Sequence, residues 1–208
     1  MKIIKAEIGY DYFAPFYYKQ YEHLDSFDWK VAKETLFSKL DSFFNMSNNT
    51  IKIGDLGCGD GRILKRVHNY LEEKNYKNYQ IFGIDVSEKM LKSANKKLKN
   101  KVKLIKLDLE KEKLAENFDI IYCFFLLVHI KDVDDFFFNI KDCLNEGGIF
   151  IFNNIEQKKG FKLPFFKEET YIEFFDHSDI KIYDLAQKYF SYVEKIKSQY
   201  STIFICEK

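Results

Sequence analysis

The stretch I-K-I-G-D-L-G-C-G-D-G-R, residues 51–62, decides the fold of this chain. A short β-branched run ends at the acid Asp55, glycines follow at positions 57, 59 and 61, and a helical pattern then begins. A backbone that leaves a strand, turns sharply and enters a helix beside a ligand needs residues without a Cβ atom. The stretch therefore predicts a strand–turn–helix unit with a ligand at the turn; the alternative is an ordinary tight turn.

The spacing of these glycines differs from the dinucleotide-binding fingerprint G-x-G-x-x-G, which seats a pyrophosphate on a helix N-terminus. Here the third glycine comes one residue earlier, and position 62 is Arg. Asp55 stands two residues before the first glycine, where its negative charge would repel a phosphate. We therefore expect a ligand that carries a cation and no phosphate, which disfavours a nicotinamide-dependent dehydrogenase.

The segment D-L-G-C-G-D-G, residues 55–61, closely resembles motif I of the class I S-adenosylmethionine-dependent methyltransferases. The resemblance implies a Rossmann-like α/β fold and S-adenosyl-L-methionine, a sulfonium with an amino-acid tail, as the cofactor. It also implies cofactor contacts at Asp55, Gly57, Cys58 and Gly59.

Bulk properties indicate one domain, residues 1–208, which is long enough to bury a sizeable core. The formal net charge is only +1, so composition provides no argument for a nucleic-acid partner. The four cysteines show no C-x-x-C spacing and lie in or beside apolar runs, as is typical of reduced cysteines in a cytoplasmic protein.

Two further features argue against a membrane or secreted protein. The longest apolar run, Ile120 to Ile130, is too short to span a bilayer and contains His129. The first ten residues alternate charged and apolar side chains and do not form the apolar block of a signal peptide. We therefore expect a soluble protein without a membrane partner.

Strand and helix patterns alternate between residues 51 and 154. Strands are predicted at 51–55, 79–84, 101–107, 118–124 and 147–154, and helices at about 61–74, 87–99 and 132–145, the last ended by Gly147 and Gly148. The alternation predicts right-handed crossovers and a doubly wound parallel sheet with helices on both faces.

The C-terminal part adds a helix and a hairpin. Ser178 is a predicted N-cap for a helix ending near Tyr189. Residues 191–196 and 200–206 are β-rich and separated by only three residues, which is too short for a crossover helix, so they must pair antiparallel. The whole predicts a seven-stranded, mostly parallel sheet with an antiparallel C-terminal hairpin, which the methyltransferase family also has.

Asp85 ends the second predicted strand, at the sheet edge where ligands of doubly wound folds bind. The segment G-I-D-V-S-E-K-M-L, residues 83–91, resembles motif II of the same family. The resemblance implies that Asp85 accepts hydrogen bonds from both ribose hydroxyls, with Val86 beside it. The alternative is a purely structural helix start, with Ser87 as the N-cap.

The third and fourth strands end at further candidate residues. By resemblance, Asp108 accepts from the adenine amine and the backbone of Leu109 meets a ring nitrogen; the alternative is a surface turn acid. Phe118 to Ile130 resembles motif IV. Its end around Cys123 to Phe125 should lie beneath the activated methyl group, with Phe124 as a cofactor contact. The chain has Cys-Phe-Phe-Leu where family members that methylate exocyclic amines have Asn/Asp-Pro-Pro-aromatic, which argues against such a substrate.

Histidine is the remaining candidate for catalysis. His129 resembles a histidine common in small-molecule methyltransferases and would suit a general base near neutral pH. A structural role for this lone histidine between apolar neighbours is the reading that we favour. His177, beside the predicted helix start, is interpreted as a capping or solvent-exposed residue. No cluster with metal-ligand spacing is present in the sequence, and no metal is expected.

Two aromatic segments fall outside the alternating pattern. In residues 9–24 Pro15 predicts a broken or two-part helix, and Asp28 is the predicted N-cap of a helix at about 29–44. We interpret residues 1–45 as a helical lid over the cofactor, with contacts from Tyr10, Tyr12 and Tyr18. Residues 157–176 are interpreted as a variable lid insertion.

The sequence therefore predicts a methyltransferase that passes a methyl group from S-adenosyl-L-methionine to a small-molecule acceptor by in-line displacement. One alternative is methylation of a protein or RNA, which a basic face around the pocket would favour. Another is a non-catalytic cofactor-binding module, which a blocked acceptor pocket would reveal. The sequence does not identify the acceptor or the oligomeric state.

Overall fold

The computed structural model describes residues 2–21, 27–47, 49–155, 162–163, 168–199 and 201–208. Its main sheet has seven strands in the order β4-β3-β2-β5-β6-β9-β8. In chain order these are β2 (Ile51–Leu56), β3 (Tyr79–Asp85), β4 (Lys103–Lys106), β5 (Phe118–Cys123), β6 (Leu144–Ile155), β8 (Tyr192–Lys197) and β9 (Ser201–Glu207). Strands β2 to β6 are parallel, and β9 runs antiparallel to both neighbours. The predicted α/β sheet with a C-terminal hairpin is confirmed.

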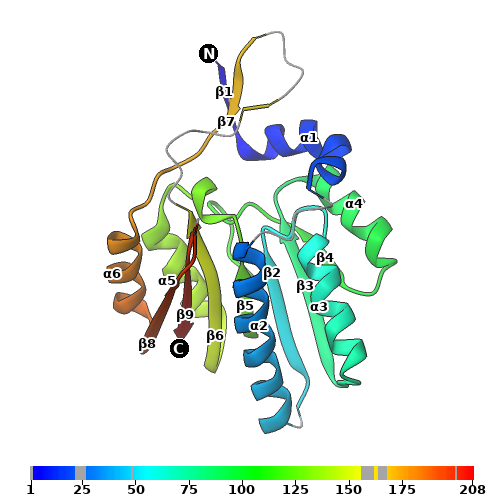
Figure 1. The fold of residues 1–208 in the computed structure, drawn as a ribbon, viewed down its shortest axis with the longest axis vertical. Helices are drawn as coiled ribbons and strands as arrows, with labels where there is room; N and C mark the ends of the chain where they lie inside the picture. Colours follow the sequence, from blue (N-terminus) through cyan, green and yellow to red (C-terminus); the bar gives the residue numbers. More distant parts are fainter. Residues whose placement is uncertain (1, 22–26, 48, 156–161, 164–167, 200) are drawn as a thin grey trace.

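Helices cover both faces of this sheet (Figure 1). Side chains of α2 (Phe27–Met46), α3 (Arg62–Glu73) and α4 (Glu88–Leu98) share one core cluster with Ile53, Ile120 and Ile151 of the sheet. Those of α5 (Val133–Cys143) and α6 (Asp179–Tyr189) share a second cluster with the alternate strand residues, such as Ile121 and Phe152. Because successive side chains on a strand point to opposite faces, the apolar strands read from the sequence fill both cores.

The strand order reverses direction beside β2. From β2 the chain moves outward through β3 and β4, then returns to β5 on the other side of β2. Such a switch point leaves a crevice at the carboxyl ends of the strands. Gly61 sets how close α3 and α4 lie there, because a Cβ atom on it would come within 2.9 Å of the Ala94 Cβ.

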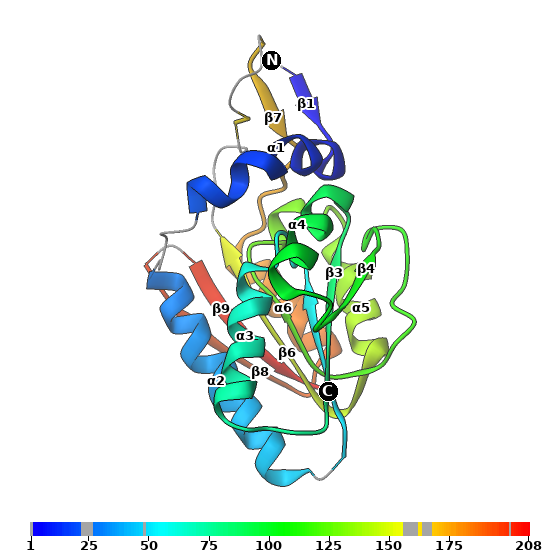
Figure 2. The ribbon, with the colours of Figure 1, turned by 90° about the vertical axis from the view of Figure 1, so that its right-hand side faces the viewer.

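A second, two-stranded sheet lies above this edge (Figures 1 and 2). Strand β1 (Lys2–Ile4) pairs in parallel with β7 (Thr170–Ile172), and α1 (Ala6–Tyr21) follows β1. Phe13 of α1 packs with Leu163 and Ile172 in a small separate cluster. This sheet, which was not predicted from the sequence, joins the two aromatic segments into one unit. We call β1, α1 and β7 the lid.

Three local predictions are wrong. Residues 6–21 form one continuous helix with Pro15 inside it, because proline removes only one hydrogen bond of the helix. Helix α2 begins at Phe27, so Asp28 lies within it and is not its N-cap. Helix α5 ends at Cys143 with Leu144 already extended, so Gly147 and Gly148 belong to β6 and end no helix.

The other predicted caps are confirmed. The Ser87 hydroxyl accepts a hydrogen bond from the Met90 N–H, and the Ser178 hydroxyl accepts one from Lys181. Among the helices that the structure describes, none combines the length and apolar character needed to cross a bilayer.

Candidate functional site

A cavity of about 280 Å³ lies at the carboxyl ends of the strands, beneath the lid. Most predicted site residues line it, although they come from distant parts of the chain: Tyr10, Gly57, Cys58, Gly59, Asp85, Val86, Asp108, Leu109, Phe124 and His129. Tyr12 and Asp55 do not line it. The side chain of Tyr18, and residues 157–161 and 164–167 of the predicted lid insertion, lie outside the described part of the chain.

The glycine loop presents bare backbone to this cavity. Gly57 and Cys58 donate backbone hydrogen bonds to the Ile84 carbonyl, at 2.8 and 3.0 Å, which ties the turn to the end of β3. Gly57 has a φ of 71°, and a Cβ atom there would meet the Leu126 side chain at 3.0 Å. A larger residue would therefore be strained and would press on the cavity wall.

Asp85 is held by the backbone on both carboxylate oxygens. It accepts from the Gly59 N–H and from the Ser87 N–H, each at 2.8 Å. Burial raises the pKa of Asp85 to about 6, although these two hydrogen bonds favour the charged form. Each oxygen has a further lone pair, so the carboxylate can still accept from a ligand.

Asp55 lies behind the glycine loop and does not line the cavity. It is 3% exposed, and its Oδ2 atom has no hydrogen-bond partner among the described residues. Burial raises its pKa well above the usual range, and the neighbouring Tyr122 hydroxyl only partly offsets this. The structure thus places Asp55 at the base of the site, beneath the turn.

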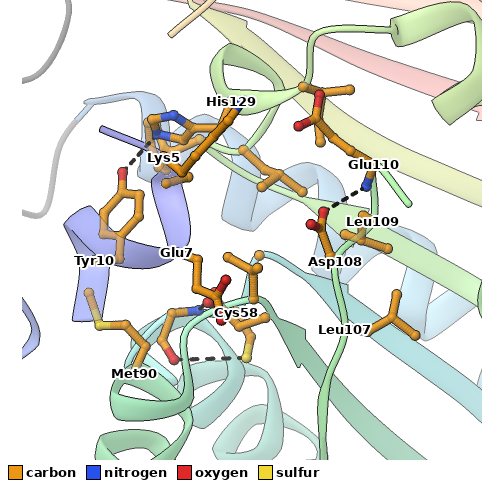
Figure 3. Close-up of a pocket in the computed structure, with 18 of the residues that line it drawn as sticks. Lys5, Glu7, Tyr10, Cys58, Met90, Leu107, Asp108, Leu109, Glu110 and His129 are labelled. Carbon is orange, nitrogen blue, oxygen red and sulfur yellow. Dashed lines mark hydrogen bonds between the residues drawn. The ribbon is translucent and has the colours of Figure 1, made fainter. Parts of the chain in front are cut away.

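The segment after β4 forms the wall of the cavity across from Tyr10 of the lid (Figure 3). Asp108 accepts from the Glu110 N–H at 3.1 Å and pairs with Lys111. These contacts place Asp108 in a turn, as the alternative interpretation of a surface turn acid predicted. Asp108 also lines the cavity beside Leu109. Both interpretations of Asp108 therefore describe part of its environment.

The end of β5 carries a strained residue. Phe125 has a φ of 63°, in the left-handed region that bulky residues rarely adopt. Its N–H donates to the side-chain oxygen of Asn153, at 2.7 Å, and Asn153 is 2% exposed on β6. This bond holds the Phe124–Phe125 turn in the cavity wall. Asn153 was not predicted, because a single buried amide has no spacing signature.

His129 has partners on both ring nitrogens. Its Nδ1 lies 2.9 Å from the Glu173 carbonyl oxygen, and its Nε2 lies 2.8 Å from the Tyr10 hydroxyl. Burial lowers its pKa, so the neutral ring is favoured. His129 thus links the lid to the core, in line with a structural role, yet it also lines the cavity.

His177 differs from its prediction. It is buried, with Nε2 2.8 Å from the Ile130 carbonyl oxygen, and the adjacent Ser178 provides the helix cap. Solvent exposure and capping are both wrong for this residue, because the chain after β7 passes beneath the surface at this point.

A second contact joins the lid to the motif II segment. The Asp11 carboxylate accepts from the Ser87 hydroxyl at 2.5 Å and from the Lys89 N–H at 3.0 Å. Ser87 in turn donates its own N–H to Asp85. The lid is therefore connected by hydrogen bonds to the acid that was expected to bind ribose.

Several charged residues that sequence reasoning missed also line the cavity: Lys5, Glu7, Asp60, Arg62, Glu110, Lys111 and Glu173. Lys5 pairs with Glu173 at 2.6 Å across 168 positions of sequence, and Asp60 pairs with Lys97. Asp60 belongs to the glycine stretch, so the motif could have indicated it. No motif could have indicated Lys5 and Glu173, because only the pairing of β1 with β7 brings them together.

Comparisons with known proteins agree with this geometry. A family model described as a methyltransferase domain matches residues 54–152. Malonyl-[acyl-carrier protein] O-methyltransferase 2 of Ilyobacter polytropus is 24% identical over 65% of this chain and 51% of its own length. Juvenile hormone acid O-methyltransferase of Bombyx mori is 34% identical over 47% of this chain and 35% of its own length. The chain spans between 35% and 56% of the length of the curated relatives it matches.

Solved structures share the fold. The structure of the DhpI–SAH complex superposes with a TM-score of 0.73, covering 95% of this chain and 92% of that chain at 14% identity. Because the identity is so low, this likeness shows the fold alone. The family model adds a match in sequence, which includes the glycine loop and the strands beside it. The family model over residues 54–152 and these neighbours of the same fold support a place in the class I S-adenosylmethionine-dependent methyltransferase family.

Proposed function

We propose that this protein transfers a methyl group from S-adenosyl-L-methionine to a small-molecule acceptor. The observation that carries the proposal is the convergence of the glycine loop, Asp85 and the Asp108–Leu109 segment on one cavity. These three segments follow three different strands, and each was expected to contact a different part of the cofactor.

The residues present fit this cofactor. Gly59 leaves open space where a Cβ atom would project, so a ligand can approach its backbone. Acidic side chains outnumber basic ones in the cavity lining, which favours a cationic ligand. The six carboxylates are Glu7, Asp60, Asp85, Asp108, Glu110 and Glu173, and the three basic side chains are Lys5, Arg62 and Lys111. Asp85 would hold the ribose, Asp108 and Leu109 the adenine, and the glycine loop the amino-acid tail.

The bound cofactor supplies a methyl group already activated by the positive sulfur. What remains for this chain is to orient the two reactants and to exclude water, which accounts for a large part of the barrier in such reactions. Phe124 is buried in the cavity wall and Tyr10 closes the lid side. We propose His129 as the catalytic residue that receives a proton from the acceptor, in addition to its link with the lid.

A small acceptor is supported by the cavity beneath the lid and by the names of the two relatives described above. Protein or RNA methylation would call for a basic rim, whereas carboxylates outnumber basic groups in this lining. A non-catalytic binding module would have side chains filling the acceptor space, whereas a cavity is present. We also propose a cytoplasmic location, which the four free, buried cysteines support.

Calorimetry of the purified chain tests the proposal. We expect micromolar binding of S-adenosylmethionine and of its demethylated product, and none of NAD. Tight binding of NAD without binding of S-adenosylmethionine would show that the cavity serves a different cofactor.

A further inference from the structure

The first turn of helix α4 is capped from two parts of the chain. The first backbone N–H groups of a helix have no partner within the helix. The Ser87 hydroxyl accepts from the Met90 N–H, as an N-cap residue usually does. The Lys89 N–H instead donates at 3.0 Å to the Asp11 carboxylate of α1, which lies above this end of α4 (Figure 2). A negative charge here also interacts favourably with the helix dipole. The lid therefore completes the cap of a core helix.

Ser87 is held by hydrogen bonds of both its hydroxyl and its backbone N–H. The hydroxyl has one proton, which it donates to Asp11 at 2.5 Å, so a lone pair faces the Met90 N–H. The backbone N–H donates to Oδ1 of Asp85 at 2.8 Å. Ser87 is completely buried, so without Asp11 its hydroxyl proton would need another partner. A shift of Ser87 would therefore move the donor that holds Oδ1 of Asp85.

The same chain of hydrogen bonds continues from Asp85 into the glycine loop. Oδ2 of Asp85 accepts from the Gly59 N–H at 2.8 Å. Asp85 and Gly59 line the cavity, whereas Asp11 and Ser87 do not. Asp11 can thus affect a ligand in the cavity only through the residues that it holds, and among these Asp85 is the residue expected to bind the ribose.

We propose that Asp11 is a positioning residue for the cofactor, which acts through Ser87 to fix the orientation of the Asp85 carboxylate toward the ribose hydroxyls. The inference rests on the proposed function and extends the cofactor site into the lid. Because Asp11 belongs to the lid and Asp85 to the core, the observed position of the lid and a bound cofactor stabilise each other.

Calorimetry with S-adenosylhomocysteine measures the effect of Asp11. Asp11→Ala should weaken binding about tenfold, because Ser87 is no longer held by a charged acceptor. Asp11→Asn removes the charge but keeps a side-chain oxygen that can accept both hydrogen bonds, so it should bind within about threefold of the unchanged chain. Glu169→Ala is the control, since it removes an exposed acid beside β7 that pairs with Lys162, and it should leave the affinity unchanged. Unchanged affinity in Asp11→Ala, or an equal loss in Asp11→Asn, would overturn the inference.

A double-mutant cycle tests the path through Ser87. Ser87→Ala keeps the backbone N–H that donates to Asp85 and removes the hydroxyl that Asp11 holds. The double variant with Asp11→Ala should bind within about threefold of the weaker single variant, because residues that act through one another do not contribute independently. A loss equal to the product of the two single losses would overturn this path. Circular dichroism checks that each variant folds, and Asp11 belongs to neither large core cluster.

Hydrogen exchange of the ligand-free protein tests the contact itself. Asp11→Ala should speed exchange of the Lys89 N–H at least about tenfold, because this group loses its acceptor, while Glu169→Ala should not. Unchanged exchange of Lys89 in Asp11→Ala would contradict the inference. Absence of S-adenosylhomocysteine binding to the unchanged chain would instead overturn the proposed function and the inference with it. Binding that Asp11→Ala leaves unchanged would overturn the inference alone.

Discussion

The edge of the large sheet and the lid both line the cavity, but different contacts bring their residues together. At the sheet edge, the glycine loop and Asp85 each follow their own buried strand, and two large core clusters support those strands. In the lid, Lys5 and Glu173 meet only because β1 pairs with β7, and the cluster beneath them is small. A two-stranded sheet has little stability of its own, so the lid depends on its contacts with the core.

The difference suggests a division of labour. We propose that the edge holds the cofactor, while the weakly supported lid opens, closes and selects the acceptor. Hydrogen bonds connect the regions, among them those of Tyr10 with His129, Asp11 with Ser87 and Glu7 with Lys106. Each of the following changes acts on one region and leaves the other in place.

Removal of the lid helix should have the largest effect. Deletion of residues 1–22 removes β1, α1 and the Tyr10 hydroxyl but none of the strands of the main sheet. Methyl transfer should fall at least about 100-fold, since the acceptor is no longer positioned and water enters the cavity. Circular dichroism should show a folded core, and S-adenosylmethionine should still bind weakly. Full activity would mean that the lid only covers the sheet.

Loss of the acid at the sheet edge comes next. Asp85→Ala should weaken S-adenosylmethionine binding by about 2–4 kcal/mol, because two hydrogen bonds to a charged acceptor disappear. Calorimetry measures the loss, and Asp142→Ala, an exposed acid on α5, serves as the control. An unchanged affinity in a folded Asp85→Ala protein would place the cofactor elsewhere.

The strained turn at the sheet edge gives a prediction on stability. Asn153→Ala removes the partner of the Phe125 N–H, and we expect the free energy of unfolding to fall by about 1–3 kcal/mol. Urea denaturation measures this loss against the unchanged chain. An unchanged stability of Asn153→Ala would mean that this bond does not hold the turn.

The pH dependence of cofactor binding has a defined sign. The pKa of Asp85 is about 6 in the folded chain, and a bound ribose would favour its charged form. Affinity should therefore be constant above pH 6 and fall about tenfold per pH unit well below it.

The contribution of Asp85 to the stability of the free protein should change with pH in the opposite direction. A raised acid pKa stabilises the protonated fold, and this contribution is lost as the pH rises from about 4 to 6. In Asp85→Asn, the affinity should lose this dependence.

How well each region could be predicted depends on how far apart in sequence its contacting residues lie. Asp85, Gly57 and Gly59 line the cavity at the predicted edge because each position is fixed by the strand beside it, and strand patterns are local in sequence. The pairing of Lys2–Ile4 with Thr170–Ile172 was missed because three-residue strands carry almost no pattern. Asn153 was missed for a related reason, since its partner lies 28 residues away and neither residue belongs to a motif.

Local propensity also failed where tertiary packing was stronger. Pro15 did not divide α1, and Phe13 of that helix is completely buried against Leu163 and Ile172. Asp55 shows a different limit. The motif resemblance implied that Asp55 contacts the cofactor, whereas in the structure this buried acid does not line the cavity.

Hydrogen exchange with and without S-adenosylhomocysteine tests most directly whether the edge and the lid close on one cofactor. We expect the ligand to slow exchange both at the edge, in residues 57–61 and 85–91, and in the lid, in residues 2–17 and 170–173. Helix α6, which packs away from the cavity, should exchange at the same rate in both states. Protection at the edge alone would leave the lid as a surface patch, and no protection at either place would contradict the proposed cofactor site.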